Sequence, residues 1–160
     1  MSAHEAVSRD PWLSIYAALK IPTATLPPTP SSLADRVALH AGKHPSHPAL
    51  EYLGVTLSYG ELDLWANRMA AVLREHGISR GDVIGVHLPN TPQYLIALVA
   101  AAKLGAVISG VSPLLTAGEM AHQINDAGIK LLLTLDQLYN PAVAPMAGQV
   151  PGLHTVLITG

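Results

Sequence analysis

The stretch VIGVHLPNTPQYLIALVAAAKLGAVISGV, residues 83–111, decides the fold of this chain. It starts with an apolar run typical of a buried strand, passes through a proline-bearing turn into a helix, and ends in a second β-branched run. Similar strand-like runs follow at 130–134 and 154–159. Their recurrence at roughly two dozen residues is the spacing of a strand plus a crossover helix. The sequence therefore predicts an α/β fold with a doubly wound, mostly parallel sheet flanked by helices.

The composition excludes several classes of function. The chain has 160 residues, 49% of them hydrophobic, and a net charge of -2, with no run rich in Lys and Arg. Neither a nucleic acid nor an anionic membrane is therefore expected as a partner. Cysteine is absent, which excludes a disulfide scaffold, a thiolate metal site and a cysteine nucleophile. The first residues lack the basic-then-apolar order of a secretory signal, so we expect a cytoplasmic location.

One apolar stretch, Tyr94 to Val111, is long enough to be compared with a membrane span. Lys103 lies inside it, and Gly105 is placed like a helix C-cap. The β-branched residues after Gly105 favour a strand. We therefore expect a buried helix followed by a buried central strand, and no transmembrane segment.

Residues 1–30 are expected to form a small helix and a proline-rich arm. Asp10 followed by Pro11 is typical of an N-cap with proline at the first helical position. Residues 21–30 carry four prolines, which forbid a regular helix or a central strand there. This arm is expected either to lie across another surface or to act as a linker.

Residues 31–160 are expected to form one α/β subdomain. Ser32 and Asp35 can cap a helix that ends at Ala41-Gly42, and a β-hairpin is predicted at residues 49–57 around Gly54. Two capping boxes are expected to open later helices, at Ser58 with Glu61 and at Thr116 with Glu119. The helix that starts after Ser58 is expected to have an apolar face made by Leu62, Trp65, Met69, Val72 and Leu73. A cap with proline in the first turn is expected at Thr91-Pro92, and a short helix near 135–140.

The sequence offers no phosphate loop. Neither GxGxxG nor GxxxxGK[ST] occurs, and the turns at 87–90 and 112–115 contain proline, which makes them structural turns. The serines at 58, 109 and 112 lack the glycine-flanked nucleophile elbow. No paired carboxylates are evident. We therefore assign no catalytic, cofactor-binding or metal-binding residue within these 160 residues.

Histidines are the remaining candidates for a site. His40, His44 and His47 have spacings that would suit a metal, but Gly42 and Pro45 should break any helix that aligns them. His87 ends a strand, where ligands of this architecture gather. We interpret His87 as a hydrogen-bonded residue at the edge of the core.

Two motifs carry a resemblance to a known family. Leu57-Ser58-Tyr59-Gly60-Glu61-Leu62 resembles the first core motif of the AMP-forming adenylating enzymes, and the segment from Lys103 to Pro113 resembles the second. Pro11-Trp12-Leu13 near the start is similar to the opening of bacterial fatty acyl-CoA ligases. The segment 112–120 is similar to their Asn-Pro-Leu-Tyr-Thr-Pro-x-Glu-Leu, with departures at Ser112, Leu115, Ala117 and Met120.

The resemblance implies a two-step reaction. A carboxylic acid, here a fatty acid, reacts with ATP to give an acyl-adenylate and pyrophosphate, and coenzyme A then gives the thioester and AMP. It also implies that the family's ATP loop, its acidic residue for Mg²⁺, its ribose-binding aspartate and its catalytic lysine would all follow Gly160. The chain is thus expected to be an N-terminal fragment, inactive by itself, without tight binding of ATP, Mg²⁺ or coenzyme A, and able to form a homo-oligomer through an exposed apolar face.

Two other functions remain open from the residues alone. A free-standing, non-catalytic α/β interaction or regulatory module would also be short and lack a catalytic set. A dinucleotide-binding enzyme is disfavoured by the missing glycine fingerprint.

Overall fold

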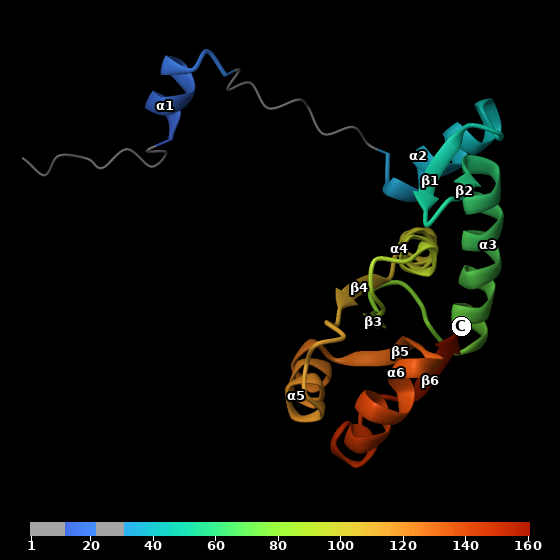
Figure 1. Ribbon diagram of the computed structural model, residues 1–160, viewed down its shortest axis with the longest axis vertical. Helices are drawn as coiled ribbons and strands as arrows, with labels where there is room; N and C mark the ends of the chain where they lie inside the picture. Colours follow the sequence, from blue (N-terminus) through green and yellow to red (C-terminus); the bar gives the residue numbers. More distant parts are fainter. Residues whose placement is uncertain (1–11, 22–30) are drawn as a thin grey trace, which may run out of the picture. The chain divides into compact units, whose positions relative to one another are not determined.

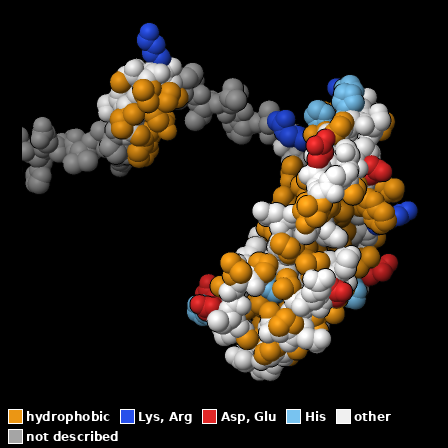
Figure 2. All heavy atoms as spheres, in the orientation of Figure 1, with side chains coloured by type: hydrophobic (Ala, Val, Ile, Leu, Met, Phe, Trp, Pro, Cys, Tyr) orange, Lys and Arg blue, Asp and Glu red, His pale blue; other side chains and the backbone are white. Residues whose placement is uncertain are grey.

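The computed structural model describes residues 12–21 and 31–160, which belong to two units that divide after Pro30. Within the first unit, α1 (Leu13–Ala18) is a short helix with Trp12 as its N-cap residue. Its large apolar side chains are exposed, and Figure 2 shows them gathered on this helix. The predicted Asp10-Pro11 cap and the proline-rich arm from 22 to 30 lie outside the described residues.

The second unit is built on a four-stranded parallel sheet (Figure 1). Its strands are β3 (Val83–His87), β4 (Val107–Gly110), β5 (Ile129–Leu135) and β6 (Thr155–Thr159), in the spatial order β4-β3-β5-β6. The chain passes from β3 to β4 on one side and then returns across β3 to β5 and β6 on the other. The predicted doubly wound α/β fold is confirmed.

Alternating side chains of the sheet build two separate apolar layers. On one face, Leu131 and Leu133 pack with α3 (Tyr59–Glu75) and α4 (Pro92–Leu104). On the other face, Leu132 packs with α5 (Ala117–Ala127) and the irregular helices after β5. Because successive side chains of a strand point to opposite faces, an unbroken apolar run such as β5 must be covered on both sides. Helices α4 and α5 lie on opposite sides of the strands (Figure 1).

The apolar stretch from Tyr94 to Val111 is divided as predicted, into α4 and β4. Gly105 ends α4 in the left-handed conformation, with φ of 68°. Within the described part of the chain, no helix has both the length and the apolar character needed to cross a membrane.

A hairpin and a further helix precede the sheet. Strands β1 (Pro48–Tyr52) and β2 (Val55–Ser58) pair antiparallel, as predicted. Both residues of the turn, Leu53 and Gly54, have positive φ, which suits the twist of a two-residue hairpin. Helix α2 (Leu33–Lys43) packs against α3 and α4 through a small cluster of buried residues.

The predicted capping boxes are confirmed, including the one at Ser32 and Asp35. At α3 the Glu61 N–H donates to Ser58 Oγ at 3.3 Å, and the Ser58 N–H donates to Glu61 Oε2 at 2.9 Å. Each box satisfies two backbone N–H groups that the first turn of a helix leaves without partners.

The loop before β3 is bonded to β5 near the amino ends of the two strands. Lys130 of β5 donates to Asp82 at 2.5 Å, and Ser79 donates to the same carboxylate from its N–H and its hydroxyl. The hydrogen bond from Lys130, followed by those from Ser79, lowers the pKa of Asp82 to about 2.

Four predictions about these elements are wrong in detail. Helix α2 continues through Gly42 to Lys43. The α-helix predicted near 135–140 covers only α6 (Asp136–Leu138). A short π-helix (Tyr139–Val143) and a 3-10 helix (Ala144–Gln149) follow, because Pro141 and Pro145 cannot continue an α-helix. The other two concern burial. Trp65 and Val72 of α3 are 46% and 38% exposed. The strand predicted to be buried and central, β4, lies at the edge of the described sheet, and its Val107 is 50% exposed.

Gly85 in the middle of β3 provides a test of this packing. An added Cβ there would lie 2.8 Å from Leu132 Cδ1 and 3.1 Å from Ile129 Cγ2, both in the buried core. We predict that Gly85→Ala lowers the free energy of unfolding by about 1–3 kcal/mol through overpacking, measured by urea titration.

Gly118→Ala is the matched control, since Gly118 lies in α5 with no atom within 4 Å of the added Cβ. Its stability should equal or exceed that of the parent chain. Equal stability of the two variants would contradict the packing described for β3.

Candidate functional site

The carboxyl ends of β3 and β5 form the place where a ligand site is expected in this architecture. The connection after β3 leads to β4 on one side, and the connection after β5 leads to β6 on the other. Ligands of open parallel sheets bind outside the strand ends at such a switch point. The last residue pair in register there is His87 with Thr134.

His87 is a buried residue in this structure. It has no exposed surface, and its Nδ1 lies 2.8 Å from Thr134 Oγ1 in a hydrogen bond. Burial lowers the pKa of His87, so the imidazole is neutral at pH 7. Its Nε2 has no hydrogen-bond partner. The geometry is that of a hydrogen-bonded residue at the edge of the core.

The turns that follow β3 and β4 are stiffened by proline. Thr91 caps α4 only through its backbone, its hydroxyl is buried without a partner, and Pro92 at the first helical position has no N–H to offer an anion. After β4, Ser112 Oγ accepts the Leu114 N–H at 3.2 Å within its own turn. These bonds and prolines leave few free N–H donors with which either turn could cradle a phosphate.

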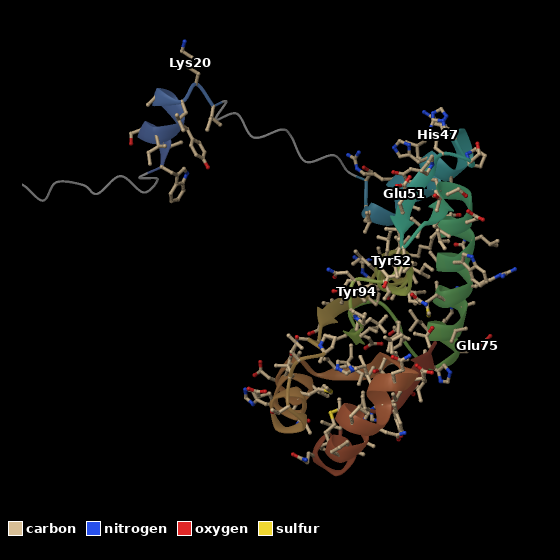
Figure 3. All side chains as sticks on the ribbon, in the orientation of Figure 1. Lys20, His47, Glu51, Tyr52, Glu75 and Tyr94 are labelled. Carbon is tan, nitrogen blue, oxygen red and sulfur yellow. The ribbon has the colours of Figure 1, made fainter. Side chains whose placement is uncertain are left out.

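The three histidines at the end of α2 are not arranged as metal ligands. His44 and His47 stack on each other with ring centroids 4.7 Å apart, and His40 stacks on Tyr59 at 5.1 Å. Among the residues that the structure describes, no three His, Asp or Glu side chains are grouped to hold a metal ion. His47 lies beside the hairpin, away from the carboxyl edge of the sheet (Figure 3).

The first of the two sequence motifs, residues 57–62, joins three elements. Its Ser58 and Glu61 form the capping box of α3, and its Tyr59 stacks on His40 of α2. An added Cβ at Gly60 would lie 3.0 Å from the carbonyl oxygen of Pro45. The motif therefore holds the hairpin, α2 and α3 together.

The second motif, residues 103–113, joins α4 to β4 and to α3. Lys103 donates to Asp63 of α3 at 2.7 Å in a partly buried ion pair. At Gly105 an added Cβ would lie 3.2 Å from the side chain of Arg80, and at Gly110 it would lie 3.0 Å from the hydroxyl of Tyr94. Both motifs thus hold elements of the fold in place.

A groove with a volume of about 520 Å³ lies between α3, the start of α4 and β6. We call it the α3–β6 groove. It is lined by Trp65, Arg68, Met69, Val72, Gln93, Ile96, Leu133 and residues 157–160. The sequence did not predict this groove, because Trp65 and Val72 have the helical spacing of core residues. They are exposed because no described element packs over them beside β6.

A smaller hollow of about 220 Å³ lies between β1 and the start of α4, lined in part by Tyr52 and Tyr94. These two side chains come from different elements and lie close to each other in Figure 3.

Residues 37–159, which are more than half of the chain, match the sequence profile of the family described as AMP-binding enzyme. The chain belongs to the AMP-binding enzyme family. The resemblance to AMP-forming adenylating enzymes seen in the two motifs is confirmed.

Curated relatives of this chain include a CoA ligase and a coenzyme A synthetase. A long-chain-fatty-acid–CoA ligase of Bacillus subtilis is 31% identical over 141 residues, which cover 85% of this chain and 24% of the relative. An acetyl-coenzyme A synthetase 2 of Candida albicans is 38% identical over 104 residues, covering 61% of this chain and 16% of the relative. The chain thus spans about a quarter or less of the length of these relatives.

Solved structures show the same fold. An anthranilate CoA ligase in complex with anthranoyl-AMP matches with a TM-score of 0.77 and 19% identity, covering 84% of this chain and 26% of that one. A fatty acyl CoA synthetase of Mycobacterium tuberculosis matches with a TM-score of 0.74 and 24% identity, covering 80% of this chain and 26% of that one.

The buried His87 predicts a pH dependence of the stability of this unit. Its pKa is lowered in the folded state, whereas the unfolded chain should titrate near 6.5. The unfolded state therefore binds more protons below about pH 6.5, so the contribution is fully present above that pH and is lost as the pH falls below it.

We predict that the free energy of unfolding, measured by urea titration from pH 7.5 to 5.5, falls with a smaller slope in His87→Gln than in the parent chain. Identical slopes would show that His87 does not titrate differently in the two states.

Proposed function

We propose that residues 31–160 are the first α/β subdomain of the large domain of an ATP-dependent acid–CoA ligase. The parent enzyme would join a carboxylic acid to ATP, releasing pyrophosphate, and then transfer the acyl group from AMP to coenzyme A. The match of residues 37–159 to the AMP-binding enzyme family is the observation that carries this proposal.

A fatty acid is the substrate class that we propose for the parent enzyme. The Bacillus subtilis relative is a long-chain-fatty-acid–CoA ligase, and so is a second relative, from Escherichia coli O6:H1, which is 30% identical over 123 residues. The parent would use ATP, Mg²⁺ and coenzyme A, and would act in the cytoplasm, where both ATP and coenzyme A are supplied.

We further propose that the 160-residue chain alone does not catalyse adenylation. Stabilising the charge that develops around the phosphates needs positioned cations and N–H donors. In the described residues Lys103 and Lys130 are committed to ion pairs with Asp63 and Asp82. The carboxyl edge of the sheet offers a neutral, buried His87 and a turn that ends in Pro92.

The expected result is that the chain shows no carboxylate-dependent exchange between ATP and pyrophosphate when given Mg²⁺ and fatty acids of several lengths. The full-length Bacillus subtilis relative serves as the positive control in the same assay. Exchange above background with the 160-residue chain would contradict the proposal of inactivity.

The mass of the protein in its native source separates this proposal from a free-standing regulatory or interaction module. A subdomain of a ligase should occur in a polypeptide several times heavier than 16.8 kDa. A native mass equal to that of the 160-residue chain would favour the non-catalytic module.

The apolar surface around the α3–β6 groove gives a prediction about association. Trp65 and Val72 are 46% and 38% exposed, and contiguous exposed apolar surface favours contact between copies. We expect the apparent mass of the isolated chain, measured by static light scattering, to rise with concentration. Val72→Asp should reduce this rise.

Leu53→Asp is the control, because Leu53 is 87% exposed in the hairpin turn and does not line the groove. A mass that stays at one monomer over the whole concentration range would contradict the prediction.

A further inference from the structure

Helix α1 of the first unit presents an apolar face that the proposed chemistry leaves unexplained. Because an α-helix turns by roughly 100° per residue, its large apolar side chains share one side. They are Trp12, Leu13, Ile15, Tyr16 and Leu19. All five are exposed, from 38% for Tyr16 to 64% for Leu19, and Figure 2 shows apolar side chains gathered on this helix. A contiguous apolar surface of this kind marks a site of interaction with a protein or a membrane.

The other side of α1 is small and carries no charge. It is formed by Ser14, Ala17 and Ala18. No Asp, Glu, Lys or Arg occurs from residue 12 to residue 19, so the helix has no charged group with which to pair an acidic or basic partner. The chain also lacks the run of Lys and Arg that attracts a protein to anionic lipids.

The aromatic residues of α1 are of the two types that concentrate where a bilayer meets water. Trp12 and Tyr16 are four residues apart and lie on the same side of the helix. Their rings are apolar, whereas the indole N–H and the phenol O–H need hydrogen-bond partners, which the headgroup region supplies. Lys20 follows four residues later, and its aliphatic stem can lie along apolar surface while the ammonium group stays in water. This combination is typical of a helix that lies in a membrane surface.

The size of α1 disfavours a protein as the partner. Its six residues make a helix about 9 Å long. One face of such a helix falls short of the about 800 Å² per partner that a stable protein interface buries. A membrane needs no complementary surface, since the strength of binding scales with the apolar area that enters it.

We propose that α1 is a membrane-surface helix, which inserts Trp12, Ile15 and Leu19 between the headgroups and the acyl chains of a lipid bilayer. Apolar burial drives the binding, so neutral phosphatidylcholine is sufficient and lipid packing matters more than lipid charge. The inference does not depend on the proposed function, although a fatty acid substrate would partition into the same membranes.

The fluorescence of Trp12 in the 160-residue chain tests the inference. The chain has two tryptophans, so Trp65→Phe leaves Trp12 as the single reporter. Phosphatidylcholine vesicles added at high salt should shift its emission to shorter wavelength, and lipids brominated on their acyl chains should quench it. Small, highly curved vesicles should bind more tightly than large ones of the same lipid, because looser packing admits large side chains.

Two variants locate the binding face. Leu19→Asp places a carboxylate on the apolar side and should weaken vesicle binding roughly tenfold or more. Ala18→Asp is the matched control, because it adds the same charge one residue earlier, on the side of the small residues. It should leave the affinity close to that of the parent chain. Both side chains are exposed, so neither substitution should move the urea unfolding midpoint.

Four results would overturn the inference. An emission spectrum unchanged by vesicles would show that α1 does not enter a membrane, and equal loss of binding in both variants would show that the apolar side is not what binds. Binding that requires phosphatidylserine and disappears at high salt would assign an electrostatic contact. Short-wavelength emission without vesicles would make a protein surface the occupant, and that surface belongs to a second copy where the shift appears only as the protein concentration rises.

Discussion

The requirement that β5 be buried on both faces is the constraint on which the rest of the second unit depends. Leu131 and Leu133 face one layer and Leu132 faces the other, and all three are almost fully buried. Burial of each such side chain contributes roughly 1.5–3 kcal/mol, which makes the centre of the sheet the main source of stability. Each helix layer is placed by the need to cover one of these faces.

The same constraint explains why one part of the unit is only partly covered. Helices α3 and α4 extend far enough to cover β3 and β5, but the face of β6 next to them is only partly covered. The exposed side chains of Trp65 and Val72 belong to this boundary. The groove is therefore a consequence of where the layer of helices ends, and its position follows from the topology of the sheet.

The two family motifs hold neighbouring helices and strands of this chain together. Ser58 and Glu61 fix the start of α3, and Lys103 ties α4 to Asp63 of α3 by a partly buried ion pair. Gly105 lets the chain turn sharply between α4 and β4 against Arg80. A motif that marks a family of enzymes thus also holds helices and strands in place.

The amino-acid sequence by itself determined the strands, their parallel arrangement and the capped helix starts, because these depend on local spacing and on backbone groups within one turn. Only the tertiary structure decided which apolar residues are covered. Trp65 has the spacing of a core residue but is exposed, while His87 and Thr134, distant in sequence, form a buried pair. Periodicity tells which side chains share a face, whereas burial depends on whether another element packs against that face.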